Sequence, residues 1–137
     1  MIPLNQCWCR EAVKTMMPNE SGAIVTMGLI RVRLCVSHPR RLRGVLAQLT
    51  GTLALEAIAH GIRVNAFVVG DVVTNILNRV VGDGPGFLAR HGETAPIGRA
   101  GQLEEIAEIV ALLTSDRASY MVDSMVMADG GMTVTAG

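Results

Sequence analysis

The hydrophobic residues between positions 40 and 60 recur at spacings of three and four, which places them on one face of a helix. His60 lies in the last predicted turn, where positive charge suits the helix dipole, and Gly61 stands where a left-handed residue would end the helix. The pattern therefore predicts a long amphipathic helix over residues 40–60. Its apolar stripe consists of Leu42, Val45, Leu46, Leu49 and Leu53.

The pattern changes after this helix to a short, β-branched and nearly continuous apolar run from Ile62 to Val69. Such a run is typical of a parallel strand that is covered on both faces. A turn that begins at Gly70 and reaches Thr74 follows the run. In open α/β sheets ligands bind just beyond the carboxyl ends of such strands, so this turn is the first candidate for a binding site.

The rest of the chain has the pattern of further helices and strands in alternation. Pro18 to Gly22 has the composition of a turn, and Glu104 and Glu105 suit the dipole at the start of a later helix. The predicted elements are a helix within residues 1–17, a strand at 22–27, a short helix at 76–81, a helix at 103–114, a strand at 124–128 and a turn at 129–131.

Two long segments carry motifs in a definite order and spacing. The first is LALEAIAHGIRVNAFVVGDVVT, residues 53–74, which combines a helix, an H-G-I-R-V-N strand and a G-x-x-x-T turn. The second is PIGRAGQLEEIAEIVALLTSDRASYMVDSMVMADGGMT, residues 96–133. Together they resemble the carboxyl-terminal half of the short-chain dehydrogenase/reductase (SDR) family. The resemblance is specific for the fold and says less about activity, because fold does not carry function with it.

The resemblance implies a partial Rossmann-like, doubly wound α/β fold, with a parallel sheet of about three strands and flanking helices. Residues 1–137 are then expected to form a single truncated domain that lacks the family's amino-terminal, dinucleotide-binding half. The chain would retain the last three strands of the family's sheet, in contiguous order. Family members also associate through the helices that match residues 5–17 and 40–60, and through the last helix and strand.

An active family member moves a proton with a tyrosine, a lysine four residues later and a serine. Counting back from the first motif without gaps places the tyrosine position at Pro39 and the lysine position at Arg43. Proline has no ionisable group. Arginine stays charged, but with proline at the tyrosine position there is no phenol whose pKa it could lower. The serine position falls on Thr26 by the same count, or on Gly28 or Leu29 if the strand is aligned directly. The resemblance therefore implies no catalytic residue in this chain.

A dinucleotide site in this family also needs a glycine-rich turn after the first strand, where the pyrophosphate meets a helix N-terminus. The sequence has no such motif, since Gly82 to Gly86 follows no predicted strand and includes a proline, which has no N–H to donate. What matches is the turn that holds the nicotinamide amide in the family, with valine in place of proline. Its positions are Val69, Gly70, Val72 and Thr74.

The matching turn alone is expected to hold no cofactor, so NAD(P) is expected only for the family or for an active partner. We predict instead that Gly70 supplies backbone freedom and that Thr74 caps the short helix after it. In the family the segment matching residues 75–95 is a mobile lid, and its three glycines suit a hinge. An ordinary surface loop is the other interpretation of that segment.

The composition narrows the classes of function. Twelve basic and twelve acidic residues give zero net charge, which argues against a general binder of nucleic acid or of anionic membranes. No apolar run approaches the roughly 18 residues of a membrane span. Three cysteines without an even disulfide framework suit a reducing, cytoplasmic location. Cys7 and Cys9 would point to different sides of a helix, and no zinc-spaced cluster follows, so no metal site is expected.

These observations together predict a catalytically inactive SDR homologue, a pseudoenzyme that forms a homo- or hetero-oligomer with an SDR-family subunit and stabilises it. One alternative is a fragment of an NAD(P)-dependent oxidoreductase or ketoreductase whose amino-terminal half is missing. Another is a small anion- or nucleotide-binding module built on a cluster of arginines, for which a solvated loop and helix start is the competing interpretation. The cluster consists of Arg31, Arg33, Arg40, Arg41 and Arg43.

Overall fold

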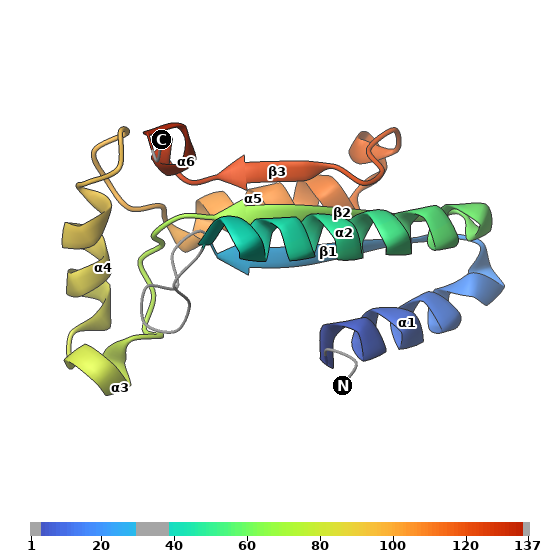
Figure 1. The fold of residues 1–137 in the computed structure, drawn as a ribbon, viewed down its shortest axis with the longest axis horizontal. Helices are drawn as coiled ribbons and strands as arrows, with labels where there is room; N and C mark the ends of the chain where they lie inside the picture. Colours follow the sequence, from blue (N-terminus) through green and yellow to red (C-terminus); the bar gives the residue numbers. More distant parts are fainter. Residues whose placement is uncertain (1–3, 30–38, 136–137) are drawn as a thin grey trace.

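A three-stranded parallel sheet forms the centre of the protein, in the order β1–β2–β3 (Figure 1). The computed structural model describes residues 4–29 and 39–135. The strands are β1 (Gly22–Leu29), β2 (Ile62–Val69) and β3 (Met125–Ala128). Because the strands are parallel, their carboxyl ends meet at one edge of the sheet. The predicted partial Rossmann-like α/β sheet is confirmed.

Helices cover both faces of this sheet (Figure 1). The helices α1 (Leu4–Met16) and α2 (Pro39–Ala57) pack on one face, and α5 (Leu103–Thr114) packs on the opposite face. Within the described ranges, no helix combines the length and the apolar composition that crossing a membrane requires. The shorter elements are η1 (Met17–Asn19), η2 (Ile58–His60), α3 (Asn78–Val81), α4 (Gly84–Gly92), η3 (Asp116–Ala118) and α6 (Met132–Thr135).

The middle strand, β2, is the centre of the hydrophobic core, and Arg63 is its one position that is not fully buried. Ile62 and Val64 pack with α1 and α2, whereas Phe67 and Val69 pack with α5 on the other face. Alternate residues of a strand point to opposite faces, so an apolar run is what a strand with two covered faces needs. Burying each of these side chains contributes about 1.5–3 kcal/mol.

The ends of the helices are fixed by specific residues. Gly61 has a left-handed φ of 68° and ends η2, as the sequence predicted, and a Cβ there would collide with the carbonyl oxygen of Glu20. Arg63 donates hydrogen bonds to the carbonyl oxygens of Leu113, Ser115 and Ala118. The Arg63 side chain thereby supplies hydrogen-bond donors at the carboxyl end of α5, where helical carbonyl groups lack partners within the helix.

Two sets of buried polar contacts involve the strands: the Asn65 side chain bonds the segment before β3, and Thr26 contacts Thr50 of α2. The side chain of Asn65 is 1% exposed; it donates to the carbonyl of Met121 at 2.8 Å and accepts from the N–H of Ser124 at 2.9 Å. The Thr26 hydroxyl lies 3.2 Å from that of Thr50. Since buried polar groups need partners, the Asn65 contacts tie the segment before β3 to the middle strand.

The segment after β2 contains a helix that the sequence pattern did not predict. α4 begins at Gly84 with Pro85 in its first turn, and Asp83 caps it by accepting a hydrogen bond from the N–H of Gly86. Proline and glycine suggested a hinge or loop, yet proline is well tolerated in the first helical turn. The predicted helix at 76–81 is shorter in the structure, where α3 starts at Asn78.

Candidate functional site

The carboxyl ends of β2 and β3 form the candidate site, together with the turn that follows β2. The N–H of Gly70 donates to the carbonyl of Ala128 at 3.0 Å, which joins the two strand ends. Beyond it, the N–H of Gly101 donates to the carbonyl of Asp71, and the N–H of Val73 donates back to the carbonyl of Gly101. The turn therefore runs between the end of β3 and the loop that leads into α5.

Gly70 is required for space, not for the backbone freedom that we predicted from the sequence. It is not among the glycines with a positive φ. A Cβ at Gly70 would lie 2.9 Å from the Cα of Asp129 and 3.1 Å from its carbonyl oxygen. The segments that carry Gly70 and Asp129 approach so closely that any side chain at position 70 would force them apart.

The other predicted cofactor-turn residues have structural surroundings. Val69 is buried, and Val72 forms an isolated parallel bridge with Gly101 and packs against the α5 core. The prediction that Thr74 caps a helix is wrong, because α3 begins four residues later with Leu77 at its N-cap. The Thr74 hydroxyl instead accepts a hydrogen bond from the N–H of Ile76 at 3.4 Å, which closes a local turn.

Of Thr26, Pro39 and Arg43, which the ungapped count placed at the family's proton-transfer positions, only Thr26 has a side chain within the described part of the structure. Thr26 lies in the middle of β1, and its hydroxyl is engaged by Thr50 and by the carbonyl of Asn65. Pro39 and Arg43 belong to the first turns of α2, but their side chains lie outside the described part of the chain. Arg31 and Arg33, and the side chains of Arg40 and Arg41, lie outside it too.

A pocket of about 310 Å³ opens at the same strand ends, between β3, the turn before α5 and the start of α5 itself. This is at the small end of the range for small-molecule sites, about 300–1,000 Å³. The sequence analysis did not identify it, because it is assembled from segments that are far apart along the chain. Its lining includes Asp71, Arg99, Glu105, Ile106, Met127 and Asp129.

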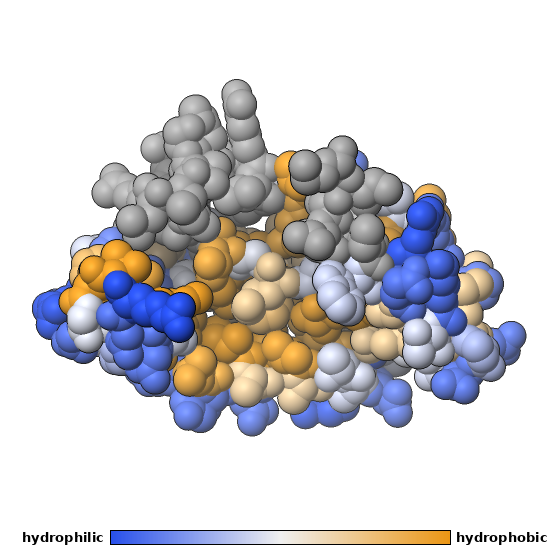
Figure 2. Space-filling model, turned by 90° about the horizontal axis from the view of Figure 1, so that it is seen from below, coloured by the Kyte–Doolittle hydropathy of each residue, from blue (hydrophilic) through white to orange (hydrophobic). Residues whose placement is uncertain are grey.

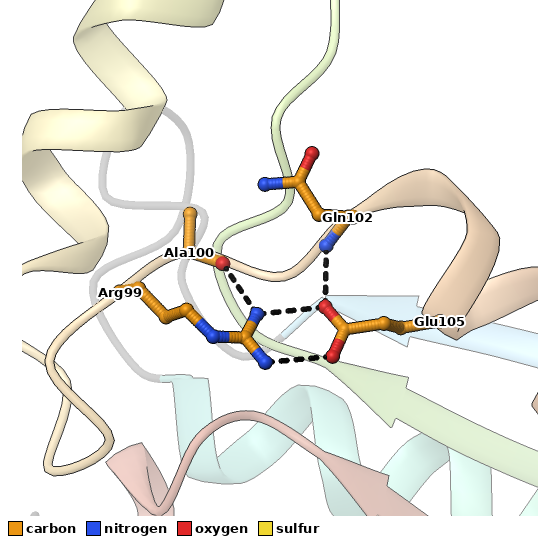
Figure 3. A network of polar contacts seen from close by, with 4 residues as sticks. All are labelled: Arg99, Ala100, Gln102 and Glu105. Atoms are coloured by element: carbon orange, nitrogen blue, oxygen red, sulfur yellow. Dashed lines mark hydrogen bonds and ion pairs between the residues drawn. The ribbon is translucent and has the colours of Figure 1, made fainter.

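An ion pair anchors one wall of the pocket (Figure 3). The guanidinium of Arg99 donates to both carboxylate oxygens of Glu105 at 2.7 Å, and also to the carbonyl of Ala100 at 3.1 Å. The backbone N–H of Gln102 donates to the same carboxylate at 2.8 Å. These hydrogen bonds lower the pKa of Glu105 to about 2 and raise the pKa of Arg99, so both groups stay charged near neutral pH.

Asp129, at the end of β3, is held in the same way by backbone groups. Burial alone would raise the pKa of its carboxyl group. Hydrogen bonds from Thr133 and from the N–H of Gly131 outweigh that effect, so the pKa lies below its usual range. The predicted turn at residues 129–131 is therefore a capped turn whose carboxylate is already saturated with donors.

A contact between His91 and Asp71 fixes α4 against the end of β2. The Nδ1 atom of His91 lies 2.6 Å from the Oδ2 atom of Asp71, and the ring of Phe87 stacks on the imidazole. Gly92 approaches the backbone of Ala100 so closely that a Cβ would collide with it. Twenty residues separate the two partners in sequence, and no local motif signals their contact.

The contacts of Glu105, Asp129 and Asp71 connect the segments that meet at the strand ends. Among the described residues, every buried side-chain nitrogen or oxygen has a partner, and no group of three potential metal ligands is present. Cys9 of α1 lies in the core cluster that also contains Leu53 and Ala54 of α2, and burial raises the pKa of its thiol.

The chain matches the family described as Enoyl-(Acyl carrier protein) reductase over residues 6–133. It is 37% identical over 131 residues to an uncharacterized oxidoreductase, YgfF, of Escherichia coli, covering 90% of this chain and 52% of the relative. It is 32% identical to galactitol 2-dehydrogenase (L-tagatose-forming) of Cereibacter sphaeroides, covering 93% of this chain and 52% of that enzyme. The chain therefore spans about half the length of the curated relatives it matches.

Solved structures resemble the fold over the same extent. A short chain dehydrogenase/reductase family protein aligns with a TM-score of 0.70 and 29% identity, covering 90% of this chain and 51% of its own. A gluconate 5-dehydrogenase from Burkholderia cenocepacia, in complex with NADP and tartrate, aligns with a TM-score of 0.73 at 22% identity, covering 93% and 51%. The second likeness concerns the fold alone.

Proposed function

The chain belongs to the short-chain dehydrogenase/reductase family, and from that premise we propose that it is a non-catalytic subunit that assembles with an SDR-family oxidoreductase. The observation that carries the proposal is a set of large apolar side chains that are exposed on α1, α2 and η2, which we call the assembly face. On this face Trp8 is 75% exposed and Leu55 79% exposed. The remaining large apolar residues of this assembly face are Val45 and Ile58.

The strand-end site supports a role without catalysis. Proline and arginine stand at the tyrosine and lysine positions, and Thr26 is committed to Thr50 and Asn65. Two backbone donors of the cofactor turn are also engaged within the chain, since Gly70 donates to Ala128 and Val73 donates to Gly101. The described residues therefore fit a nicotinamide cofactor poorly, and they offer no glycine-rich turn for its phosphates.

The exposed assembly face supports a role in association. Each of its large side chains would contribute about 1.5–3 kcal/mol if a partner covered it, before the cost of association is subtracted. The helices α1 and α2 correspond to the segments through which the sequence resemblance led us to expect pairing.

Purification of the tagged chain from its native source tests the proposal. We expect an SDR-family subunit to accompany it in fixed stoichiometry, identified by mass spectrometry, and to leave when Leu55 is replaced by lysine. Tyr120→Lys is the matched control, because Tyr120 is fully exposed and lies outside α1 and α2. A chain that elutes alone, or NAD(P)-linked turnover by the purified 137-residue chain, would contradict the proposal.

The half-length match favours a second candidate, in which the chain is part of an NAD(P)-dependent oxidoreductase. Relatives of about twice its length include dehydrogenases, and one related structure contains NADP. Reading the coding region upstream for an in-frame glycine-rich motif distinguishes the two candidates. Even with such a segment, Pro39 would leave the tyrosine position without an ionisable group.

A further inference from the structure

The pocket at the ends of β2 and β3 combines an apolar surface with charged groups in its lining. Its volume of about 310 Å³ suits a small molecule. The apolar part includes Ile106 and Ile109 of α5 and Met127 of β3. Three carboxylates and one guanidinium supply the charge, so the lining is negative overall. These groups belong to Asp71, Glu105, Asp129 and Arg99.

The hydrogen-bond donors beside the pocket are engaged within the chain. Both terminal nitrogens of the Arg99 guanidinium donate to the carboxylate of Glu105. The backbone N–H groups of Gly131 and Thr133 donate to the carboxylate of Asp129. An anionic ligand would therefore meet an excess of negative charge and donors that already have acceptors, which makes the pocket unsuitable for it.

One carboxylate oxygen in the lining can still accept a hydrogen bond. The Oδ2 atom of Asp71 lies 2.6 Å from the Nδ1 atom of His91, whereas its Oδ1 atom has no hydrogen-bond partner among the described residues. The Asp71 side chain is 12% exposed. Since every buried side-chain oxygen in the described ranges has a partner, Oδ1 is accessible from outside the protein. A cationic donor suits such an atom, because charge-assisted hydrogen bonds are the stronger ones.

We propose that this pocket binds a small organic cation, an alkylammonium ion with a compact aliphatic body. The ammonium group donates a hydrogen bond to the Oδ1 atom of Asp71, and the aliphatic body packs against Ile106, Ile109 and Met127. This inference goes beyond the proposed function, because the ligand requires neither a partner subunit nor a nicotinamide cofactor.

The charges and their spacing favour an organic cation over a metal ion. Hydrogen bonds lower the pKa of Glu105 to about 2 and the pKa of Asp129 below its usual range, so both carboxylates are ionised at neutral pH. Within the described part of the chain, no three potential metal ligands converge on one point. The carboxylates thus attract a cation without forming the oxygen cage that a calcium or magnesium ion requires.

Three probes that share one body and differ in their head group test the proposal. Cyclohexylmethylamine, cyclohexylmethanol and cyclohexanecarboxylate are titrated into the purified chain by calorimetry at neutral pH. We expect the amine to bind saturably, about tenfold or more tighter than the alcohol, and the carboxylate not to bind. The alcohol also measures adhesion to exposed hydrophobic surface, such as the middle of the face that Figure 2 shows from below. Equal affinity for the amine and the alcohol, or no saturable binding of the amine, would overturn the proposal.

Substitutions in the lining locate the site. Asp71→Asn removes the charge of the accepting group and should weaken amine binding about tenfold. Met127→Lys places a competing ammonium group in the lining and should abolish binding. Glu108→Gln is the matched control, because it removes a carboxylate of α5 that does not line the pocket, and it should bind the amine like the unmodified chain. Unchanged affinity in both lining variants would place the amine elsewhere and contradict the proposal.

The unmodified chain keeps the test decisive if a lining variant fails to fold. Amide chemical shifts measured by NMR during the amine titration should change at residues 97–109 and 127–132, which contain most of the lining. Changes confined to other segments would overturn the proposal. Because the chain is measured alone, the result does not depend on whether an SDR-family subunit accompanies it, so failure here and failure of the proposed function are separate outcomes.

Discussion

β1 and β2 are neighbouring parallel strands of equal length and similar apolar composition, yet their surroundings differ completely. β2 has a strand on each side and a helix layer on each face, and seven of its eight residues are buried. β1 has a strand on one side, and only Ile24 is buried. The comparison teaches that the same hydrophobic pattern gives an enclosed strand where neighbours complete it and a partly exposed strand where, among the described residues, they do not.

The strand ends show the same contrast. Beyond β2, backbone contacts from two other segments fill the space around Gly70, and Arg99, Glu105 and Asp129 are bonded within the chain. At the end of β1, Leu29 is exposed. The end of β2 is therefore held by contacts within the chain, whereas the last residue of β1 is partly exposed.

The largest expected effect comes from cutting the polar network of β2. Asn65→Ala removes the partners of the Met121 carbonyl and the Ser124 N–H, and leaves a small cavity. We expect the free energy of unfolding to fall by about 2–4 kcal/mol, measured by urea denaturation. Thr52→Ala, which removes an exposed hydroxyl bonded to its own helix, should change it by less than about 0.5 kcal/mol. Equal losses in both variants would contradict this account.

A smaller effect is expected at the ends of the two strands. Gly70→Ala pushes a methyl group against the backbone of Asp129, which cannot move alone, and should lower the free energy of unfolding by about 1–3 kcal/mol. Gly28→Ala meets only the Cδ2 atom of Leu46, at 2.8 Å, and that flexible side chain can turn away. Its expected cost is below about 1 kcal/mol, because the loss of glycine also reduces unfolded-state entropy. A larger loss in Gly28→Ala would reverse the comparison.

The smallest effect concerns the ion pair at the pocket. The pKa of Glu105 is lowered to about 2 by Arg99 and by the N–H of Gln102, so its stabilising contribution is present above its ordinary pKa of 4.5. It is lost as the pH falls from there towards about 2. Because the pair is exposed, we expect a shallow slope of melting temperature with pH in this window. The slope should be reduced in Glu105→Gln and kept in Glu108→Gln, a substitution in the same helix.

The elements could be predicted because their signals are local. The helix over residues 40–60, the stop at Gly61 and the apolar run to Val69 each depend on residues close in sequence, and these predictions agree with the structure. Within the predicted stripe, Leu53 is buried but Val45 is exposed. α4 was missed because Pro85 resembles a breaker and is harmless in a first turn. Its capping residue, Asp83, is a local signal that could have identified the helix.

The candidate site was predicted less completely, because its contacts join distant segments. The turn at residues 69–74 was recognised by its motif, but the physical reason for Gly70 depends on Asp129, which no local pattern reveals. The same holds for the contact between His91 and Asp71. The helix cap proposed for Thr74 was wrong because it assumed that a helix starts directly after the turn.

The sequence by itself determined the family and the order of the main elements, since periodicity and motif spacing are properties of the chain. Only the tertiary structure decided which strand is enclosed and which is partly exposed. Enclosure depends on neighbours that the chain brings together from a distance. Apolar strands such as β1 and β2 have similar local patterns, and only the packing of their neighbours decides how deeply each is buried.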